Sequence, residues 1–128
     1  MRKRVILVCA ISLSLGCGDT PPGYSPMGGG SSSCTPTATQ VCMVGNKFNP
    51  SNLVITHGTA VTWMNGDKVT HTVGNATGSA EVFTSNFIGE GQLYSHTFAT
   101  PGTFQYYCAI HGADGNPPTG MHGTITVN

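Results

Sequence analysis

Apolar and polar residues alternate in short runs from position 38 onward, which is the pattern of β-strands with one buried face. Val41 and Met43 fall on one face of the first run, and Leu53 and Ile55 share a face of a later one. Another run covers 60–64 and ends at an Asn-Gly pair, which is a strong turn signal. No helical period persists over roughly ten residues, so we expect an all-β domain.

The second half of the chain predicts further short strands around one irregular segment. We expect strands at 69–73 and 123–127, and between them an irregular segment, 74–91, that Phe83 and Phe87 anchor in the core. Two more strands, joined by a Pro-Gly turn, each present one face of mostly aromatic residues: Tyr94, His96 and Phe98 on the first, and Phe104, Tyr106 and Cys108 on the second. About seven or eight strands in roughly 90 residues predict an antiparallel Greek-key sandwich or barrel.

The first 16 residues have the three parts of an export signal. Residues 2–4 are basic, and 5–15 form an apolar stretch that is shorter than the roughly 20 residues needed to span a bilayer. The sequence Leu-Ser-Leu-Gly-Cys that ends at Cys17 resembles a bacterial lipobox, although Ser14 stands where Leu is usual. We therefore predict export, with removal of 1–16 and lipidation of Cys17. An ordinary cleaved signal peptide is the alternative.

Residues 17–37 consist mainly of Pro, Gly, Ser and Thr. Such a segment cannot bury enough apolar area to offset the entropy of ordering, so we predict a flexible tether with a reach of roughly 25 Å. A disordered tail without this role fits the same composition. The folded domain is predicted to cover 38–128.

The five cysteines differ in their expected roles. Cys9 lies in the export signal, and Cys17 is the predicted lipid site. Cys34 and Cys42 are eight residues apart in a chain bound for an oxidising compartment, so a disulfide between them is predicted. Cys108 is then left without a partner, which requires an explanation in an exported protein.

Charged residues make up 8% of the chain, too few for the surface of a soluble helical bundle. The formal net charge of +0 includes the three basic residues of the export signal. The mature chain keeps two Lys and five Asp or Glu, so its net charge is 2 − 5 = −3, and it has no basic patch. Nucleic acid is therefore not an expected partner.

Candidate metal ligands gather in the last third of the chain. Cys108 and His111 are three residues apart at the end of a strand, and Met121 follows on the same loop. His71 offers a second imidazole from upstream. Two His, one Cys and a weak axial Met are the donor set of blue copper sites. Structural zinc could use the same donors, but it rarely takes a Met ligand.

Several motifs, in the same order, resemble those of the cupredoxins, specifically the plastocyanin-like and amicyanin-like small blue copper proteins. The resemblance covers about 38–128 and rests on 47–50 (KFNP), 58–63 (GTAVTW), 67–73 (DKVTHTV), 102–104 (GTF) and 107–111 (YCAIH). It implies one type 1 copper ion, with His71, Cys108 and His111 as equatorial ligands and Met121 as the axial ligand. The segment between His111 and Met121, residues 112–120, is longer than in close relatives.

Three other histidines compete with this assignment. His122 directly follows Met121, and only one of the two can face the metal because side chains alternate along an extended chain. We predict that Met121 does. His96 lies among aromatic residues and is expected to be a hydrogen-bonded structural residue, and His57 precedes a turn and is expected to be exposed.

The resemblance implies a one-electron carrier that is not an enzyme. Its partners would be exported redox proteins such as a cytochrome, an oxidase or a reductase. We expect a periplasmic or cell-envelope monomer that touches the membrane only through a lipid anchor. Copper delivery, storage or sensing is the alternative, but such sites usually expose Met-rich or His-rich tracts, and the tether contains only Met27. Multicopper enzymes need further copper sites, typically with His-x-His pairs, and the sequence has none.

Overall fold

Eight strands form in residues 33–128, which are the residues that the computed structural model describes. The strands are β1 (Gln40–Met43), β2 (Phe48–Asn49), β3 (Asn52–Ile55), β4 (Thr59–Asn65), β5 (Gly74–Asn75), β6 (Leu93–Phe98), β7 (Gly102–Ala113) and β8 (Thr119–Val127), and no helix occurs among them. Alternation explains them: on β4, Val61, Trp63 and Asn65 are buried, whereas Thr62 and Met64 between them are only half-buried.

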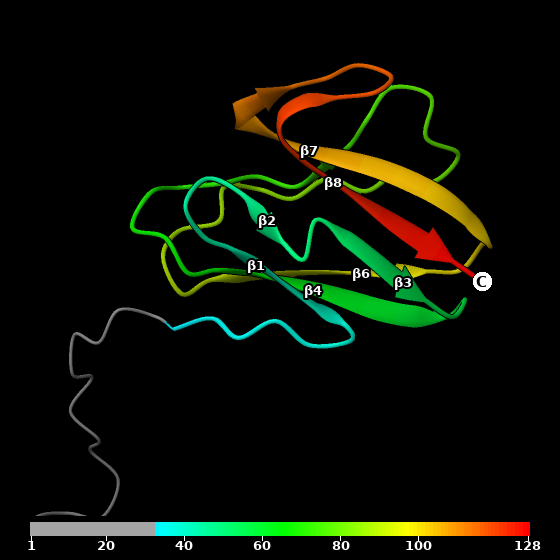
Figure 1. Cartoon of the computed structure of the whole chain (residues 1–128), viewed down its shortest axis with the longest axis horizontal. Helices are drawn as coiled ribbons and strands as arrows, with labels where there is room; N and C mark the ends of the chain where they lie inside the picture. Colours follow the sequence, from blue (N-terminus) through cyan, green and yellow to red (C-terminus); the bar gives the residue numbers. More distant parts are fainter. Residues whose placement is uncertain (1–32) are drawn as a thin grey trace, which may run out of the picture.

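The strands form two four-stranded sheets that pack face to face (Figure 1). One sheet has the order β2-β1-β4-β6 and the other the order β3-β8-β7-β5. β1 pairs with β4 and β3 with β8 in parallel, and the other neighbours are antiparallel. Because β3 joins the opposite sheet, the chain returns to the first sheet only at β4. β4 therefore runs in the same direction as β1. The predicted all-β sandwich is confirmed, but its strands are mostly rather than wholly antiparallel.

Aromatic side chains fill the space between the two sheets around Trp63. Its ring centroid lies 5.4 Å from that of Tyr106, 6.0 Å from that of Phe83 and 6.3 Å from that of Phe98. Such pairs each contribute about 0.5–1.5 kcal/mol beyond the burial of their area. Tyr106 is buried on the same face of β7 as Cys108, so this packed core continues into the candidate metal site.

The predicted strand at 69–73 is wrong, because this segment is a loop with one isolated bridge to Ile88. The buried side chain of Asn65 explains the difference. Its amide donates hydrogen bonds to the backbone oxygens of Val69 and Ile88, both at 2.8 Å, and its Oδ1 accepts the N–H of Asp67 at 2.8 Å. These bonds hold the chain in a bend, and regular pairing resumes only at β5.

One of the two predicted anchors in the irregular segment 74–91 is correct. Phe83 is buried, but Phe87 is 75% exposed, so the prediction for Phe87 is wrong. Its neighbour Ile88 takes the core position and exchanges two backbone hydrogen bonds with His71. Since adjacent side chains of an extended chain point to opposite sides, Phe87 faces solvent.

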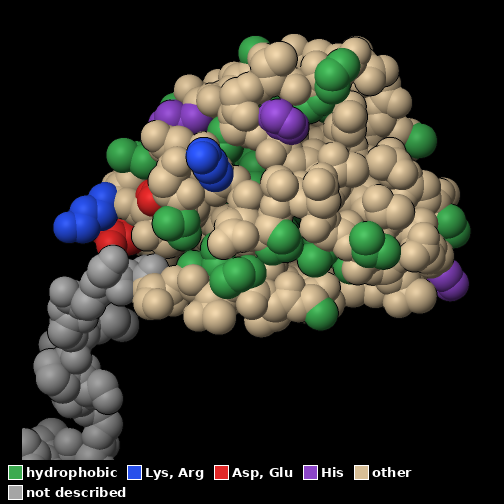
Figure 2. All heavy atoms as spheres, in the orientation of Figure 1, with side chains coloured by type: hydrophobic (Ala, Val, Ile, Leu, Met, Phe, Trp, Pro, Cys, Tyr) green, Lys and Arg blue, Asp and Glu red, His purple; other side chains and the backbone are tan. Residues whose placement is uncertain are grey.

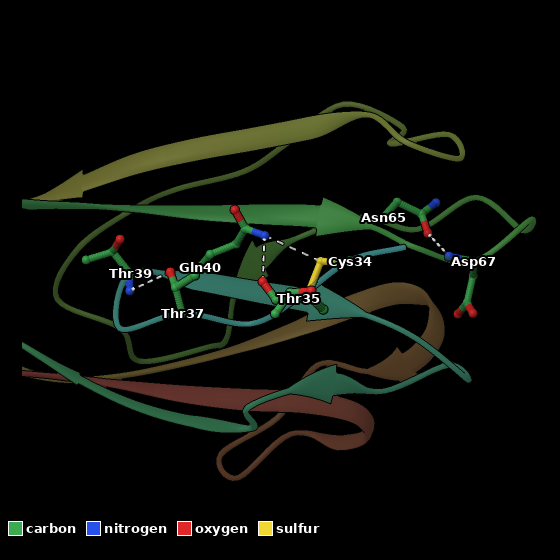
Figure 3. The surroundings of a disulfide bond; sticks show 8 residues. Cys34, Thr35, Thr37, Thr39, Gln40, Asn65 and Asp67 are labelled. Carbon is green, nitrogen blue, oxygen red and sulfur yellow. Dashed lines mark hydrogen bonds between the residues drawn. A yellow bond between two sulfur atoms is a disulfide. The ribbon is translucent and has the colours of Figure 1, made fainter. Parts of the chain in front are cut away.

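Cys34 and Cys42 form the predicted disulfide, which fastens the start of the described chain to β1 (Figure 3). Their Cα atoms are 5.7 Å apart, and the side-chain amide of Gln40 donates a hydrogen bond to the carbonyl oxygen of Thr35 at 3.0 Å. The export signal, Cys17 and most of the predicted tether lie outside the described residues. Between 33 and 128, no helix is long and apolar enough to cross a membrane.

Candidate metal centre

Strand β7 and the loop before β5 bring His71, Cys108 and His111 together. Sγ of Cys108 is 3.8 Å from Nδ1 of His71 and 3.7 Å from Nδ1 of His111, and the two Nδ1 atoms are 3.1 Å apart. His71 and Cys108 are completely buried, whereas His111 is half-buried. The three donor atoms therefore face one point below the surface, and only His111 connects that point with solvent.

The spacing of these donor atoms fits a transition-metal ion. Such ions bind imidazole nitrogen at about 2.0–2.1 Å and thiolate sulfur at about 2.3 Å, and in a trigonal site these lengths separate sulfur and nitrogen by about 3.8 Å and two nitrogens by about 3.5 Å. The observed separations are 3.7 and 3.8 Å between sulfur and nitrogen and 3.1 Å between the nitrogens. One thiolate with two imidazoles is a donor set that suits copper.

An irregularity in the ladder between β7 and β8 produces this convergence. Tyr107 pairs with His122, and the next pair is Gly112 with Gly120. Residues 108–111 of β7 therefore stand opposite a single residue of β8. Such a bulge bends a strand and redirects its side chains, so it lets both Cys108 and His111 reach the same site.

Two glycines close the hairpin directly beyond the ligands. A Cβ on Gly112 would lie 2.7 Å from the carbonyl oxygen of Thr119 and 2.9 Å from that of Met121. Gly120 adopts φ 72°, in the left-handed region that favours glycine, and its Cβ would lie 2.7 Å from the carbonyl oxygen of His111. Any side chain at either position would push β7 and β8 apart where they carry the candidate ligands.

Asp67 orients the imidazole of His71. Its Oδ2 lies 3.0 Å from Nε2 of His71, and its carboxylate accepts the backbone N–H groups of Gly45 at 2.8 Å and Asn46 at 3.1 Å. Burial raises the pKa of Asp67, but these N–H groups and His71 outweigh it, so the pKa lies below its ordinary value. Burial lowers the pKa of His71, although Asp67 acts in the opposite direction. A neutral His71 that donates its Nε2 proton to Asp67 presents the Nδ1 lone pair that a metal needs.

Thr72 supports the sulfur of Cys108. The backbone N–H of Thr72 donates to Sγ at 3.3 Å, and its hydroxyl lies 3.8 Å from Sγ and accepts the N–H of Ala109 at 2.8 Å. Hydrogen bonds to a ligating sulfur withdraw charge from it and tune the reduction potential of the metal. They also fix the distance between the loop of His71 and strand β7.

Met121 and His122 point to opposite sides of β8. Met121 is buried, in contact with the core, and stands opposite the bulge that carries Cys108 and His111. His122 is exposed, and its Nδ1 lies 2.9 Å from the carbonyl oxygen of Gly120. This placement favours Met121 over His122, and its role as axial ligand stays a prediction.

His96 and His57, the two remaining histidines, do not belong to the candidate metal centre. His96 stacks on Phe83 and places its Nε2 2.7 Å from Oε1 of Glu81, which confirms the expected structural role. His57 is exposed, as expected. Local sequence patterns predict no role for Asp67 or Thr72; the position of Asp67, four residues before His71, is the only sequence signal for either.

A family model described as copper binding proteins of the plastocyanin/azurin family matches residues 32–128. Among curated proteins, plastocyanin from Scenedesmus fuscus is 33% identical over 88 residues, which are 62% of this chain and 85% of that protein.

Solved structures match with similar coverage. A methionine-to-glutamine mutant of amicyanin with Cu(I) has a TM-score of 0.60 and 26% identity, over 70% of this chain and 80% of that one. The copper-containing nitrite reductase NirK from Thermus scotoductus has a TM-score of 0.61 and 32% identity, over 75% of this chain but only 23% of the enzyme. The chain therefore corresponds to a small part of NirK and to most of amicyanin.

Proposed function

Because this chain belongs to the copper-binding plastocyanin/azurin family, we propose that it carries single electrons between redox proteins outside the cytoplasm. Bound copper supplies this chemistry by alternating between Cu(I) and Cu(II). The observation that carries the proposal is the convergence of three donor atoms, two of which neighbouring groups already hold in place. We also propose Met121 as the fourth, axial ligand.

The residues of this chain supply a fixed and largely dry site. Asp67 holds His71, Thr72 holds the sulfur of Cys108, and the aromatic core packs behind both. Ligands that keep their positions in both oxidation states lower the reorganisation that accompanies electron transfer. His111 is the half-buried ligand, so its imidazole edge is the proposed point of electron entry and exit.

The surface favours docking through neutral contacts. Residues 33–128 carry only two Lys and four Asp or Glu, and Figure 2 shows the few charged side chains on the face in view lying toward one end. Ile110, beside His111, is 47% exposed. We therefore propose that binding to a cytochrome, oxidase or reductase depends little on salt concentration, since long-range charge steering requires stronger fields than this surface provides.

Two other functions, copper delivery or storage and catalysis, account for the site less well than electron transfer does. Copper delivery or storage requires ligands that exchange metal readily, but His71 and Cys108 are fully buried. The neighbour NirK is an enzyme, and the similarity to it covers 23% of its chain. Within residues 33–128, the one cluster of three His, Cys or acidic ligands is His71, Cys108 and His111. We therefore propose a carrier that is not itself an enzyme.

The N-terminal segment determines the proposed location. We propose that residues 1–16 are removed on export, that Cys17 carries lipid, and that 17–37 tether the domain 38–128 to the membrane surface. The carrier would then act in the periplasm or cell envelope as a monomer. Mass spectrometry of the protein from the membrane fraction should find lipid on Cys17, and an unmodified Cys17 in a wholly soluble protein would contradict the anchor.

The visible spectrum tests the central proposal. The purified protein with one equivalent of Cu²⁺ should become intensely blue, lose its colour on reduction and regain it on oxidation while keeping its copper. Cys108→Ser should abolish the colour, and His57→Ala, which changes an exposed histidine, should not. A colourless wild-type protein would refute the carrier, and loss of copper to a Cu(I) chelator in every cycle would favour delivery instead.

A further inference from the structure

We propose that Asp114 is a positioning residue that ties the ligand hairpin to the turn around Thr77 and so holds His111 in place before metal binds. This inference rests on the proposed copper site. It gives a role to the segment 112–120, which the sequence marks as unusually long.

The contact between Asp114 and Thr77 uses both oxygens of the carboxylate. Oδ1 accepts the backbone N–H of Thr77 at 2.7 Å, and Oδ2 accepts its hydroxyl at 2.6 Å. Oδ1 also accepts the N–H of Gly115 at 2.8 Å, which fixes the carboxylate within its own turn. The hydroxyl and N–H of Thr77 lower the pKa of Asp114, so the carboxylate is ionised near neutral pH and these bonds are charge-assisted.

A second residue of the segment also lies beside the same turn. Strand β7 continues to Ala113 and β8 begins at Thr119, so both ends of 112–120 extend the hairpin and 114–118 form its loop (Figure 1). Pro118 is buried, and the side-chain amide of Asn116 lies 3.5 Å from where a Cβ on Gly78 would stand. A small polar groove is lined by 76–79, by Asn116 and, from β7, by Thr103 and Gln105. The tip of the hairpin therefore approaches this turn at Asp114 and at Asn116.

His111 is the ligand that most needs such support. The Nε2 of His71 has Asp67 as a partner, and the sulfur of Cys108 has the N–H of Thr72. Among residues 33–128, the hydrogen-bonding contacts of the His111 ring are with Cys108 and His71 alone, the two groups that turn to the metal when it binds. Its position therefore depends on the backbone of the hairpin.

The position of the contact in the chain explains how it acts. Thr77 follows His71 by six residues, and Asp114 follows His111 by three. The bonds between Thr77 and Asp114 therefore join the two segments that carry these imidazoles. They meet the hairpin after His111, whereas Thr72 contacts Cys108 and Ala109 before it. Together the two sets of bonds link the segments at two points, one before and one after His111 in β7 and its loop.

Asp114→Ala and Thr77→Val test the inference, first in the metal-free protein. Both variants should increase the NMR-detected motion of the His111 ring, and the double variant should do so no more than Asp114→Ala. Thr77→Ser keeps both bonds and should behave as wild type. Ser79→Ala removes a hydroxyl bond to the carbonyl of Glu81 in the same turn, without touching the hairpin, and is the matched control.

Copper-loaded protein provides the second measurement. Asp114→Ala and Thr77→Val should slow electron self-exchange several-fold and alter the electron paramagnetic resonance spectrum, whereas Thr77→Ser and Ser79→Ala should do neither. If His111 and the copper spectra stay as in wild type while the Thr77 amide loses its exchange protection, the bonds are only structural and the inference is refuted. A colourless wild-type protein would refute the proposed function instead, and the metal-free measurement would still decide the role of Asp114.

Discussion

Replacing Gly112 by Ala should disturb the metal site without introducing any polar or charged group. The new Cβ would lie 2.7 Å from the carbonyl oxygen of Thr119, 2.9 Å from that of Met121 and 3.1 Å from that of Cys108. Ordinary contact begins at 3.4 Å, so β7 and β8 must separate by about 3.4 − 2.7 = 0.7 Å at this point. All three obstructing atoms belong to the backbone, and no side-chain rotation can relieve the overlap.

The expected cost follows from the size of this displacement. Overpacking of this kind costs about 1–3 kcal/mol of unfolding free energy. In a domain of this size each kcal/mol lowers Tm by about 4–8 °C, so Tm should fall by at least about 4 °C. The ratio of the two thiolate-to-copper absorption bands should also change. Two of the three displaced carbonyl groups belong to Cys108 and Met121, which are the candidate thiolate ligand and the proposed axial ligand.

Gly74→Ala is the matched control for this experiment. Gly74 lies in β5, has no positive φ, and has no atom within 4 Å of the position of a Cβ. The same substitution there should leave the spectrum unchanged and Tm equal or slightly higher, because Ala restricts the unfolded chain. If Gly112→Ala matches Gly74→Ala in both Tm and spectrum, the close approach of the two strands does not position the ligands.

Three further changes address other parts of the site and its support. Met121→Gln should lower the reduction potential and change the spectrum, because a thioether favours Cu(I), whereas His122→Ala should change neither; voltammetry that finds the reverse would assign His122 as the ligand. Asp67→Asn should weaken copper binding about 10–100-fold in a competition titration, and an unchanged affinity would mean that Asp67 does not orient His71. Replacing both Cys34 and Cys42 by Ala should lower the unfolding free energy by roughly 2–3 kcal/mol in chemical denaturation but keep the blue colour; an equally stable double variant would contradict this.

Local alternation predicts the strands well because each strand places its own side chains on one buried face. The predicted run 60–64 lies within β4. The predicted face of Phe104, Tyr106 and Cys108 is the buried face of β7. The motif at 107–111 likewise places Cys108 and His111 beside His71, since a strand end and a single bulge are enough to aim both side chains.

Features that depend on distant residues are not visible in local patterns. The parallel pairing of β1 with β4 arises only because β3 crosses to the other sheet. The segment 69–73 alternates like a strand. However, the side-chain amide of Asn65 donates hydrogen bonds to the backbone oxygens of Val69 and Ile88, and these bonds bend the segment. Phe87 lies in an irregular segment that has no period to show which side is buried. The pairs of Gly112 with Gly120 and Ala113 with Thr119 extend the strands into both ends of a segment whose composition predicts a loop.

The supports around the ligands differ in a way that bears on electron transfer. His71 is held through Asp67 by the N–H groups of Gly45 and Asn46, and the sulfur of Cys108 is held by the N–H of Thr72. Hydrogen-bonded groups in a buried network move little, because breaking one bond leaves a polar group without a partner. Rearrangement on a change of oxidation state should therefore fall mainly on His111, which is also the ligand nearest to a partner. Efficient transfer through this half-buried imidazole would then require support from outside the candidate ligands, and the bonds between Asp114 and Thr77 are placed to provide it.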